Sequence, residues 1–400
     1  MKTGFALLTV LLAALTLPAV AATPLTVKEL GALIAGMQQQ NKSDSQIAEK
    51  LKEVSLSEQL TPAGIEQLRA MNLGPETQGQ VRVLVTESAL LPPPAADLPT
   101  TAAPDADTQK TVLGKAATYV AEFTQLPRLT ADKTTVRFQN GPDYIFSSDG
   151  GVRMAQANLG QQFAPDNPYF QVMGEQKESV EVSGGVEVLP TKIKEGDPGT
   201  ENGQIAEEGP GPELGAAFDE ASKGKLQFER WETVNGKPLA VFSFEVPKKQ
   251  ARYEVSYCCF PETQNVGSHL GGPAGSSSIS GMGPGGGGGG GGSPMSYATL
   301  TTFEPFHTKV GYHGEFFIDP ASGDVLRFVM EADLKKSDFV REDDTRIDYG
   351  PVIVNGKTMI LPVQSFVLTT LVPAGDSGQR VAERRTLLEI HYANYHTPGQ

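Results

Sequence analysis

The stretch GEFFIDPASGDVLRF, from Gly314 to Phe328, indicates the architecture of most of this chain. Two runs in which apolar and polar residues alternate flank DPASGD, a cluster of residues that favour turns. This pattern is typical of a β-hairpin with one apolar face. The expected apolar face carries Val310, Tyr312, Phe316, Ile318, Leu326, Phe328, Met330 and Leu334, and the other face carries His313, Glu315, Arg327, Glu331 and Asp333. We therefore expect a sheet with one apolar face and one face toward solvent.

Similar strand signals recur from Thr130 to the end of the chain. Asn235-Gly236 and Asn355-Gly356 each separate two alternating runs, and Asn-Gly is the strongest short hairpin signal. Roughly eight to eleven antiparallel strands, each rotated by about 20–25° from its neighbour, will curl into a half-barrel with a concave apolar face. Asp348-Tyr349-Gly350-Pro351 interrupts one strand, and a bulge or bend is the favoured interpretation of this interruption.

Residues 22–90 have helical rather than strand periodicity. Thr26–Glu29, Ser43–Gln46 and Ser55–Glu58 each match the capping box that begins a helix. Thr61 is followed by a proline that suits a first helical position, and Gly74 is placed where a helix would end. The segment is therefore predicted to form a small bundle of four or five short helices, for which core packing explains the apolar stripes.

Residues 91–108 form a Pro/Ala-rich segment without periodicity, which is typical of a linker. The third unit, 109–400, is predicted to be the half-barrel domain. Within it we expect helices at 109–123 and 213–222 to cover the apolar face, and a disordered Gly-rich insertion at 262–298. The predicted fold class is α+β, with a small N-terminal helical bundle followed by a large curved antiparallel sheet that has one or two covering helices.

The first residues resemble a signal peptide. Lys2 precedes an uncharged, mostly apolar run, and Ala19-Val20-Ala21 suits a signal peptidase, so residues 1–21 are expected to be removed. The alternative is a retained N-terminal anchor. No later stretch reaches about 18 apolar residues, so we expect an exported protein, periplasmic or extracellular, that is soluble after cleavage.

The charge balance argues against two classes of partner. The chain has a net charge of −14, which becomes −15 when Lys2 is removed with the signal peptide. Nucleic acids and anionic membrane surfaces attract clustered Lys and Arg, so neither is an expected partner. The acidic balance mainly favours solubility.

The two cysteines, Cys258 and Cys259, are adjacent in the sequence and cannot join distant segments. Three interpretations remain open. The residues form two thiols on opposite faces of a strand, a strained vicinal disulfide, or a link to another chain. Strand alternation favours the first interpretation.

No pattern of catalytic or metal-binding residues occurs. The five histidines form no HExxH motif, and His307 and His313 alone do not make a metal site. The GSSSISG segment lies in the Gly-rich insertion, which cannot hold a nucleophile in place. We therefore predict no catalytic residues, no metal and no cofactor, although a pair of acidic residues distant in sequence remains an alternative.

Several segments resemble a group of exported bacterial proteins of unknown function. They include IAEKLKEVSLSEQLTPAGIEQL, ATYVAEFTQLPRLTADKTTVRF, GKLQFERWETVNGKPLAVFSFEVP and IDYGPVIVNGKTMILPV, and the likeness covers most of the mature chain. The strand pattern and leading helix of the C-terminal part are similar to those of the periplasmic lipoprotein-carrier superfamily, of the LolA and RseB type. That resemblance implies a half-barrel lidded by helices, which holds acyl chains or senses envelope proteins.

Three functional hypotheses follow. The leading one is a non-enzymatic envelope protein that binds a lipid-like or lipoprotein ligand in the concave face. The expected lining residues are Phe242, Phe244, Tyr312, Phe316, Phe328, Met330 and Leu361, although an ordinary core under a helix would use the same residues. The first alternative is a protein-interaction or regulatory envelope module without a small-molecule ligand, and the second is an uncharacterised hydrolase.

Overall fold

The structure is a computed structural model of the 400-residue chain. It describes residues 24–139, 144–146, 152–154, 171–188, 214–234, 236–265, 299–371 and 384–398. The predicted signal peptide, residues 1–21, lies outside the described residues, as does segment 266–298 of the predicted insertion. The first four residues of that insertion, 262–265, belong to a strand instead.

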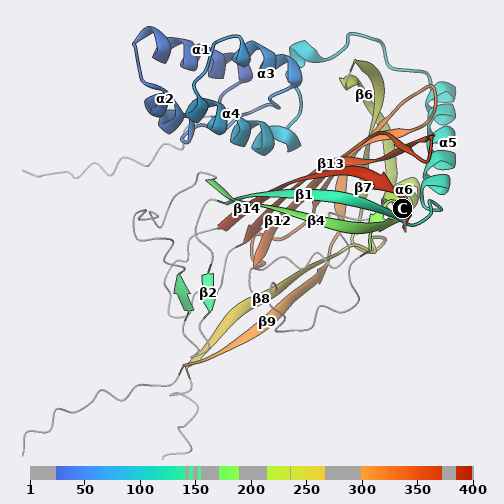
Figure 1. Ribbon diagram of the computed structural model, residues 1–400. Coiled ribbons are helices and arrows are strands. Elements are labelled where there is room, and N and C mark those ends of the chain that lie inside the picture. The colour runs from blue at the N-terminus through green and yellow to red at the C-terminus, as the bar shows by residue number, and fades with distance from the viewer. Residues whose placement is uncertain are drawn as a thin grey trace, which may run out of the picture.

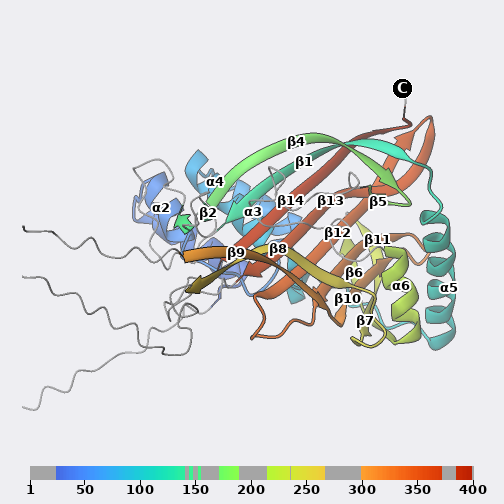
Figure 2. The ribbon, with the colours of Figure 1, turned by 90° about the horizontal axis from the view of Figure 1, so that it is seen from below.

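The fold class is α+β, as predicted, and its centre is one large antiparallel sheet (Figure 1). Its ten strands follow the order β5-β4-β1-β14-β13-β12-β11-β10-β7-β6, and its two end strands do not close on each other. Figure 2 shows the long strands β1 and β4 arching along one side of this sheet. The strands are β1 (Leu129–Gln139), β4 (Gln171–Ser183), β5 (Val186–Glu187), β6 (Lys225–Val234), β7 (Lys237–Val246), β10 (Tyr312–Ile318), β11 (Val325–Ala332), β12 (Val340–Val354), β13 (Lys357–Leu371) and β14 (Arg384–His396).

Two smaller strand pairs lie apart from the large sheet. They are β2 (Tyr144–Phe146) with β3 (Val152–Met154), and β8 (Glu254–Asn265) with β9 (Thr299–Lys309). The β8–β9 ribbon points away from the sheet in Figure 1.

The predicted turn chemistry is confirmed at the hairpin between β12 and β13. Asn355 and Gly356 have φ values of 52° and 75°, the positive angles that a type I′ turn requires at both positions. The turn between β10 and β11 is held in place by α5 (Ala106–Phe123). Lys115 of this helix donates from Nζ to the carbonyl oxygen of Ala321 at 2.8 Å. At Gly323, φ is 88° and an added Cβ would lie 2.6 Å from the carbonyl carbon of Lys115, so this turn requires glycine.

The face expected for Leu326 is wrong, because the β10–β11 pairing shifts register between Phe317 and Ile318. The resulting irregularity places Val325 in the core under the helices, whereas Leu326 packs with Phe317 on the opposite face. A bulge adds one residue to a strand and so reverses the faces on its far side.

The N-terminal segment forms four α-helices: α1 (Val27–Gln39), α2 (Asp44–Leu51), α3 (Pro62–Arg69) and α4 (Pro75–Glu87). The predicted capping boxes of Thr26 and Ser43 are both confirmed, and the side chain of Thr61 caps α3. Leucine and isoleucine side chains from these helices, among them Leu30, Ile34 and Leu84, form the core of the bundle.

The prediction of a third capping box at Ser55–Glu58 is wrong. The Glu58 carboxylate accepts a hydrogen bond from an amide that is distant in sequence. Glu58 Oε1 accepts from the backbone N–H of Val27 at 2.9 Å, and so satisfies a free amide of α1 instead of starting a helix. Between Ser55 and Glu58, Leu56 forms an isolated parallel bridge with Leu25.

The expected role of Gly74 is also wrong, since this glycine precedes α4 instead of ending α3. The carboxylate of Asp44, on α2, accepts from the backbone N–H groups of Glu76 at 2.9 Å and Thr77 at 3.1 Å. A Cβ at Gly74 would lie 2.3 Å from the Asp44 carboxyl carbon. Glycine therefore leaves space for a cap that arrives from another helix.

The predicted covering helices are confirmed on one face of the sheet. Helix α5 begins at Ala106, three residues before the expected 109, because Asp105 caps it through a bond from Thr108 N–H at 2.7 Å. With α6 (Leu214–Lys223), it packs Val112, Ala116, Val120, Phe123, Ala217 and Phe218 against the aromatic residues of β7, β10 and β11.

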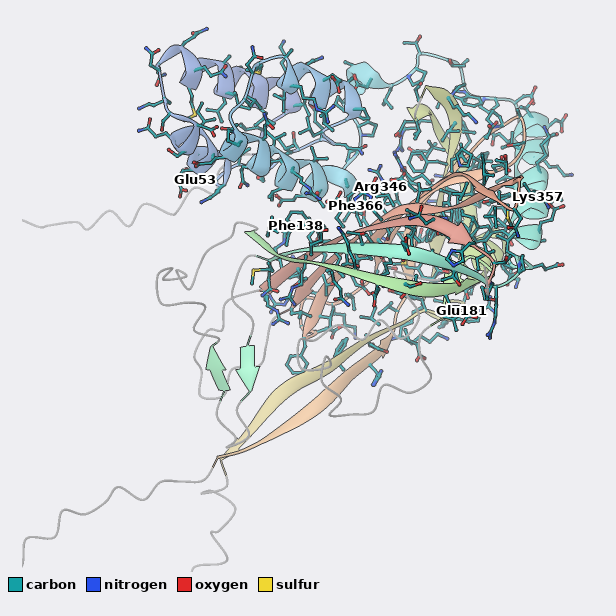
Figure 3. All side chains as sticks on the ribbon, in the orientation of Figure 1. Glu53, Phe138, Glu181, Arg346, Lys357 and Phe366 are labelled. Carbon is teal, nitrogen blue, oxygen red and sulfur yellow. The ribbon has the colours of Figure 1, made fainter. Side chains whose placement is uncertain are left out.

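The opposite face is not left to solvent, which corrects the expectation of a solvated face. Val83 of α4 and Leu90 pack against Phe138, Leu368 and Leu387 of the sheet. Arg82 pairs with Glu389 at 3.3 Å, and Arg385 pairs with Glu87 at 3.3 Å. Figure 1 and Figure 3 show the bundle lying over this face, toward which the labelled Phe138, Arg346 and Phe366 lie.

The segment expected to be a linker, residues 91–108, is hydrogen-bonded to the unit on each side of it. A short 3₁₀ helix, η1 (Ser88–Leu90), precedes the segment, and a second, η2 (Ala95–Asp97), lies within it. Pro92 O accepts from Gln59 N–H at 2.7 Å within the bundle. Ala102 O accepts from the indole N–H of Trp231 on β6 at 2.9 Å. These bonds hold the bundle and the sheet together through the segment that connects them.

We expect the substitution Asp44→Ala to lower the free energy of unfolding by about 1–2 kcal/mol, because it removes the carboxylate that accepts from two amides at the start of α4. Urea unfolding monitored by circular dichroism measures this change. The matched control is Glu49→Ala on the same helix, whose exposed pair with Lys52 contributes little. Equal effects of the two substitutions would contradict the cross-helix cap.

Candidate functional site

A cavity of about 270 Å³ lies between the bundle and the polar face of the sheet. Gln59 and residues 89–93, at the end of the bundle, form one wall. Strands β6, β7, β10, β11 and β12 form the other wall. The charged side chains that line the cavity are Arg230, Glu232, His313, Glu315, Arg327, Glu331 and Arg346.

Sheet register explains why these side chains gather in one place. Glu315 lies opposite Val329 on β11, and Val329 lies opposite Arg346 on β12. His313, Glu331 and Asp344 form the next row along the same strands. Because alternate residues of a strand point to the same face, these rows project toward the bundle while the aromatic residues between them project toward α5 and α6.

Six of the charged groups on this face form one continuous chain of ion pairs. Asp348 accepts from Arg327 Nε at 2.5 Å and from Arg346 Nε at 2.9 Å. Arg327 also contacts Glu232 at 3.4 Å, and Arg230 bonds Glu232 at 3.0 Å. Arg230 closes the chain with two bonds to Glu315, of which the one to Oε2 is 2.8 Å.

Three of these arginines lie over aromatic rings. The guanidinium carbons of Arg327 and Arg230 lie 5.2 Å and 5.8 Å from the centroid of Phe317, and that of Arg346 lies 5.4 Å from the centroid of Phe366. A guanidinium that stacks on a ring is restricted in orientation, so its donors point in fixed directions.

Burial and ion pairing have opposite effects on the pKa values of the residues in this chain of ion pairs. Burial alone would raise the pKa of Asp348, but Arg346 and Arg327 outweigh burial and hold that pKa below its ordinary value. Burial lowers the pKa of Arg346 to about 10, although Asp348 opposes this change. Burial raises the pKa of Glu232 against the attraction of Arg327 and Arg230.

A second group of titratable residues borders the cavity. His313 lies 3.3 Å from Glu331 and 2.9 Å from Asp333. The hydrogen bond with Glu331, aided by Asp333 and opposed by burial, raises the pKa of His313 to about 9, so its ring is protonated at neutral pH. Burial, together with repulsion from Glu342 and Glu331, raises the pKa of Asp344 to about 8.

Of the residues expected to line an apolar ligand site, only Phe244 is among the residues that line this cavity. Phe242, Phe244, Tyr312, Phe316, Phe328 and Met330 share one buried cluster with the apolar side chains of α5 and α6, and none is more than 3% exposed. Leu361 is also buried but belongs to a separate cluster with residues of β1, β4 and β14. The structure therefore brings six of the seven residues together, beneath the two helices.

A buried carboxylate fastens α6 over this aromatic cluster. Glu220, which is 4% exposed, accepts from Arg252 Nε at 2.6 Å and from the Tyr312 hydroxyl at 2.9 Å. It also accepts from the backbone N–H of Arg252 at 3.2 Å. These bonds satisfy a charge that would otherwise be costly at the edge of an apolar core.

The sequence interruption at Asp348-Tyr349-Gly350-Pro351 is the signal closest to this site. A register shift between Asp348 and Tyr349 confirms the expected bulge. Its first residue, Asp348, holds two arginines of the ion-pair chain. Arg230, Glu232 and Arg346 carried no sequence signal, because their importance depends on pairing between strands that are distant in sequence.

The remaining candidate residues whose side chains are described, His307 and His313, belong to different sheets. No group of three or more potential metal ligands occurs among the described residues. His307 bonds Ser256 at 2.9 Å on the β8–β9 ribbon, whereas His313 belongs to the large sheet. The ribbon shifts register between Tyr257 and Phe260, but the side chains of Cys258 and Cys259 lie outside the described part of the structure.

The adjacent carboxylates Asp343 and Asp344 are not arranged as a pair for acid–base catalysis. Asp343 and Asp344 have raised pKa values of about 6 and about 8, mainly because of burial. As neighbours on one strand they point to opposite faces of the sheet, so they do not approach one bond from two sides. Glu232 and Glu315 both bond Arg230.

No family model matches the chain, and no curated protein matches it either. One solved structure, a complex of MucA and MucB from Pseudomonas aeruginosa, aligns at 9% sequence identity with a TM-score of 0.19. The alignment covers 72% of this chain and 94% of that one. This is a loose resemblance only, on which no conclusion rests. Among the described residues, no helix is both long enough and apolar enough to span a membrane.

We expect Asp348→Asn to lower the free energy of unfolding by about 3–5 kcal/mol, because it leaves Arg327 and Arg346 buried without the carboxylate that they share. Urea unfolding measures the change. The control, Glu66→Gln, breaks an exposed pair with Arg69 and is expected to cost less than about 1 kcal/mol. A loss of similar size in both variants would contradict a role for the buried network.

We expect the effect of Asp344→Asn to depend on pH. The raised folded-state pKa of about 8 means that the wild-type protein loses stability as pH rises from about 4 to about 8, since the carboxyl must then ionise beside Glu342 and Glu331. Asparagine does not ionise, so the stability of the variant relative to wild type should increase across that window and level off above it. Thermal unfolding at several pH values tests this, and a difference that is independent of pH would contradict it.

Proposed function

We propose that this chain is a non-enzymatic binding module whose ligand site is the charged cavity between the bundle and the sheet. One observation carries the proposal: the apolar face of the sheet is covered by α5 and α6, whereas the polar face retains a cavity of about 270 Å³ under the bundle. Buried charged groups with fixed orientation are suited to recognition, because an ill-matched ligand would leave them unpaired.

The size and lining of the cavity favour a segment of a partner polypeptide. Sites for drug-sized ligands usually measure about 300–1,000 Å³, so this cavity suits one or two side chains better than a whole lipid. Its walls combine both signs of charge with Leu90, Leu91, Pro92 and Pro93. Such a mixture complements the side chains of a peptide. The predicted signal peptide, residues 1–21, supports an exported protein, so the proposed partner is another exported protein of the cell envelope.

A lipid-like ligand is a second candidate, favoured by the aromatic residues under α6. The rings of Phe244 and Phe316 stack at 4.6 Å, and those of Phe316 and Phe328 stack at 5.3 Å. They make a continuous apolar surface across three strands. In this alternative an acyl chain would replace α6, and the bonds of Glu220 would have to break first.

A peptide selection tests the proposed function. Random peptides displayed on phage are selected on the immobilised wild-type protein, and the enriched peptides are synthesised and measured by fluorescence polarisation. Val329→Phe, which fills the cavity, is expected to weaken binding at least tenfold, because Val329 lies on the cavity wall. The control Ile353→Phe changes a residue that is 73% exposed and should leave affinity unchanged. Failure to enrich any peptide, or equal affinity in both variants, would rule out the cavity as the site.

The lipid alternative has its own test, in which Glu220→Gln weakens the attachment of α6. Native mass spectrometry of protein purified from the periplasm would show a co-purifying lipid, at higher occupancy in the variant than in wild type. Absence of lipid from both proteins would exclude this alternative.

A further inference from the structure

Strand β4 is the outermost long strand at one end of the large sheet (Figure 2). Its inner side pairs with β1 without a break from Gly174 to Val182. On its outer side, β5 pairs only with Val182 and Ser183. Among the described residues, no strand pairs with the outer side of β4 before Val182. An unpaired edge of this length is a template on which another strand can pair.

One hydrogen bond shows how the backbone groups point along this edge. Val188, which directly follows β5, donates its N–H to the carbonyl oxygen of Glu181 at 2.7 Å, so the backbone groups of Glu181 point away from β1. Because this direction alternates along a strand, the backbone groups of Ser179, Lys177 and Glu175 point the same way. The side chains of these three residues are exposed. Their N–H and C=O groups can therefore pair with a strand of another chain.

The charges on this edge complement a second copy of the same edge. Lys177 Nζ lies 2.9 Å from Glu175 Oε1, and the two side chains are 72% and 49% exposed. In an antiparallel pair of β4 strands with a two-fold axis at Gln176, Lys177 of each copy lies directly opposite Glu175 of the other. Both residues point their backbone groups outward, so they form hydrogen-bonded pairs across the interface.

Neighbouring registers lack this complementarity. An axis at Glu175 would place two carboxylates directly opposite each other, and an axis at Lys177 would place two ammonium groups opposite each other. An axis at Glu178 would place Glu175 opposite Glu181. Like charges directly opposite each other destabilise a strand pair, so the sequence of this edge favours the axis at Gln176.

We propose that this chain forms a weak symmetric dimer in which the β4 edges of two copies pair antiparallel about Gln176 and join their large sheets. A lysine in the middle of an edge deters strands that would oppose it with a like charge, and admits one that opposes it with a carboxylate. The other end strand, β6, has a register shift between Phe228 and Arg230, which disrupts such pairing.

The expected dimer depends on protein concentration. A single strand pair is small compared with a standard protein–protein interface. The net charge of −14 on each copy also opposes association. The dimer is independent of the cavity under the bundle, because β4 contributes none of the residues that line that cavity.

Charge reversal tests the pairing. Sedimentation velocity of protein purified from the periplasm, over a series of concentrations, measures the monomer–dimer equilibrium. Lys177→Glu should weaken the dimer about tenfold or more, because it places carboxylates opposite each other on both sides of the axis. Combining it with Glu175→Lys restores opposite charges in both pairs and should restore the dimer. The control Lys28→Glu makes the same change in net charge at an exposed residue of α1 and should leave the equilibrium unchanged.

Cysteine substitutions locate the two-fold axis. Gln176→Cys places a thiol at the axis, where the Cα atoms of a non-hydrogen-bonded pair lie about 4.5 Å apart, within the range of a disulfide. Ser179→Cys moves the thiol three residues along the strand, so the two copies lie roughly 20 Å apart and cannot be joined. Oxidation followed by non-reducing electrophoresis should show a cross-linked dimer for Gln176→Cys only. The wild-type chain gives the background from Cys258 and Cys259.

A monomer at every concentration would overturn the proposal, as would a double charge reversal that does not restore the dimer. Equal weakening by Lys177→Glu and Lys28→Glu would also overturn it, because net charge would then explain both. Equal cross-linking of the two cysteine variants would contradict the axis at Gln176. None of these outcomes affects peptide binding in the cavity, so the dimer can fail while the proposed function stands.

Discussion

The ion pairs that Asp348 makes with Arg327 and Arg346 join strands β11 and β12 of the sheet, and through Arg346 they reach the end of the bundle. Arg346 bonds Ala89 at the end of the bundle, and Arg327 joins the same carboxylate to Glu232 on the edge strand β6. Moving charged groups out of water into the protein is costly. For this reason, apolar residues of similar size often stabilise a protein as much as a buried ion pair does. The network is therefore better explained by what it positions than by the stability that it adds.

The two faces of the sheet consequently have different roles. On one face, α5 and α6 complete an apolar core, and Glu220 fastens α6 through Arg252 and Tyr312. On the other face, the bundle contacts the sheet through a small apolar patch around Phe138 and through ion pairs. Interfaces of this mixed character within one chain are typical of units that leave space for a ligand between them.

Local signals predicted much of the fold. Turn residues such as Asn355-Gly356, and the capping boxes of Thr26 and Ser43, act within a few residues and were interpreted correctly. Ser55–Glu58 was not, because the carboxylate of Glu58 bonds Val27 in another helix. Leu326 was assigned to the wrong face because a register shift precedes it. The site was less predictable, since the burial of Arg327 and Arg346 requires the bundle to cover a face that is polar in sequence.

Hydrogen–deuterium exchange of the full chain, with and without a selected peptide, tests the central claim most directly. If the ligand lies between the bundle and the sheet, added protection should appear in residues 89–93 and in β10, β11 and β12, while α5 and α6 are unchanged. Added protection confined to α6 and the strands beneath it would contradict this account. So would the absence of added protection at residues 89–93.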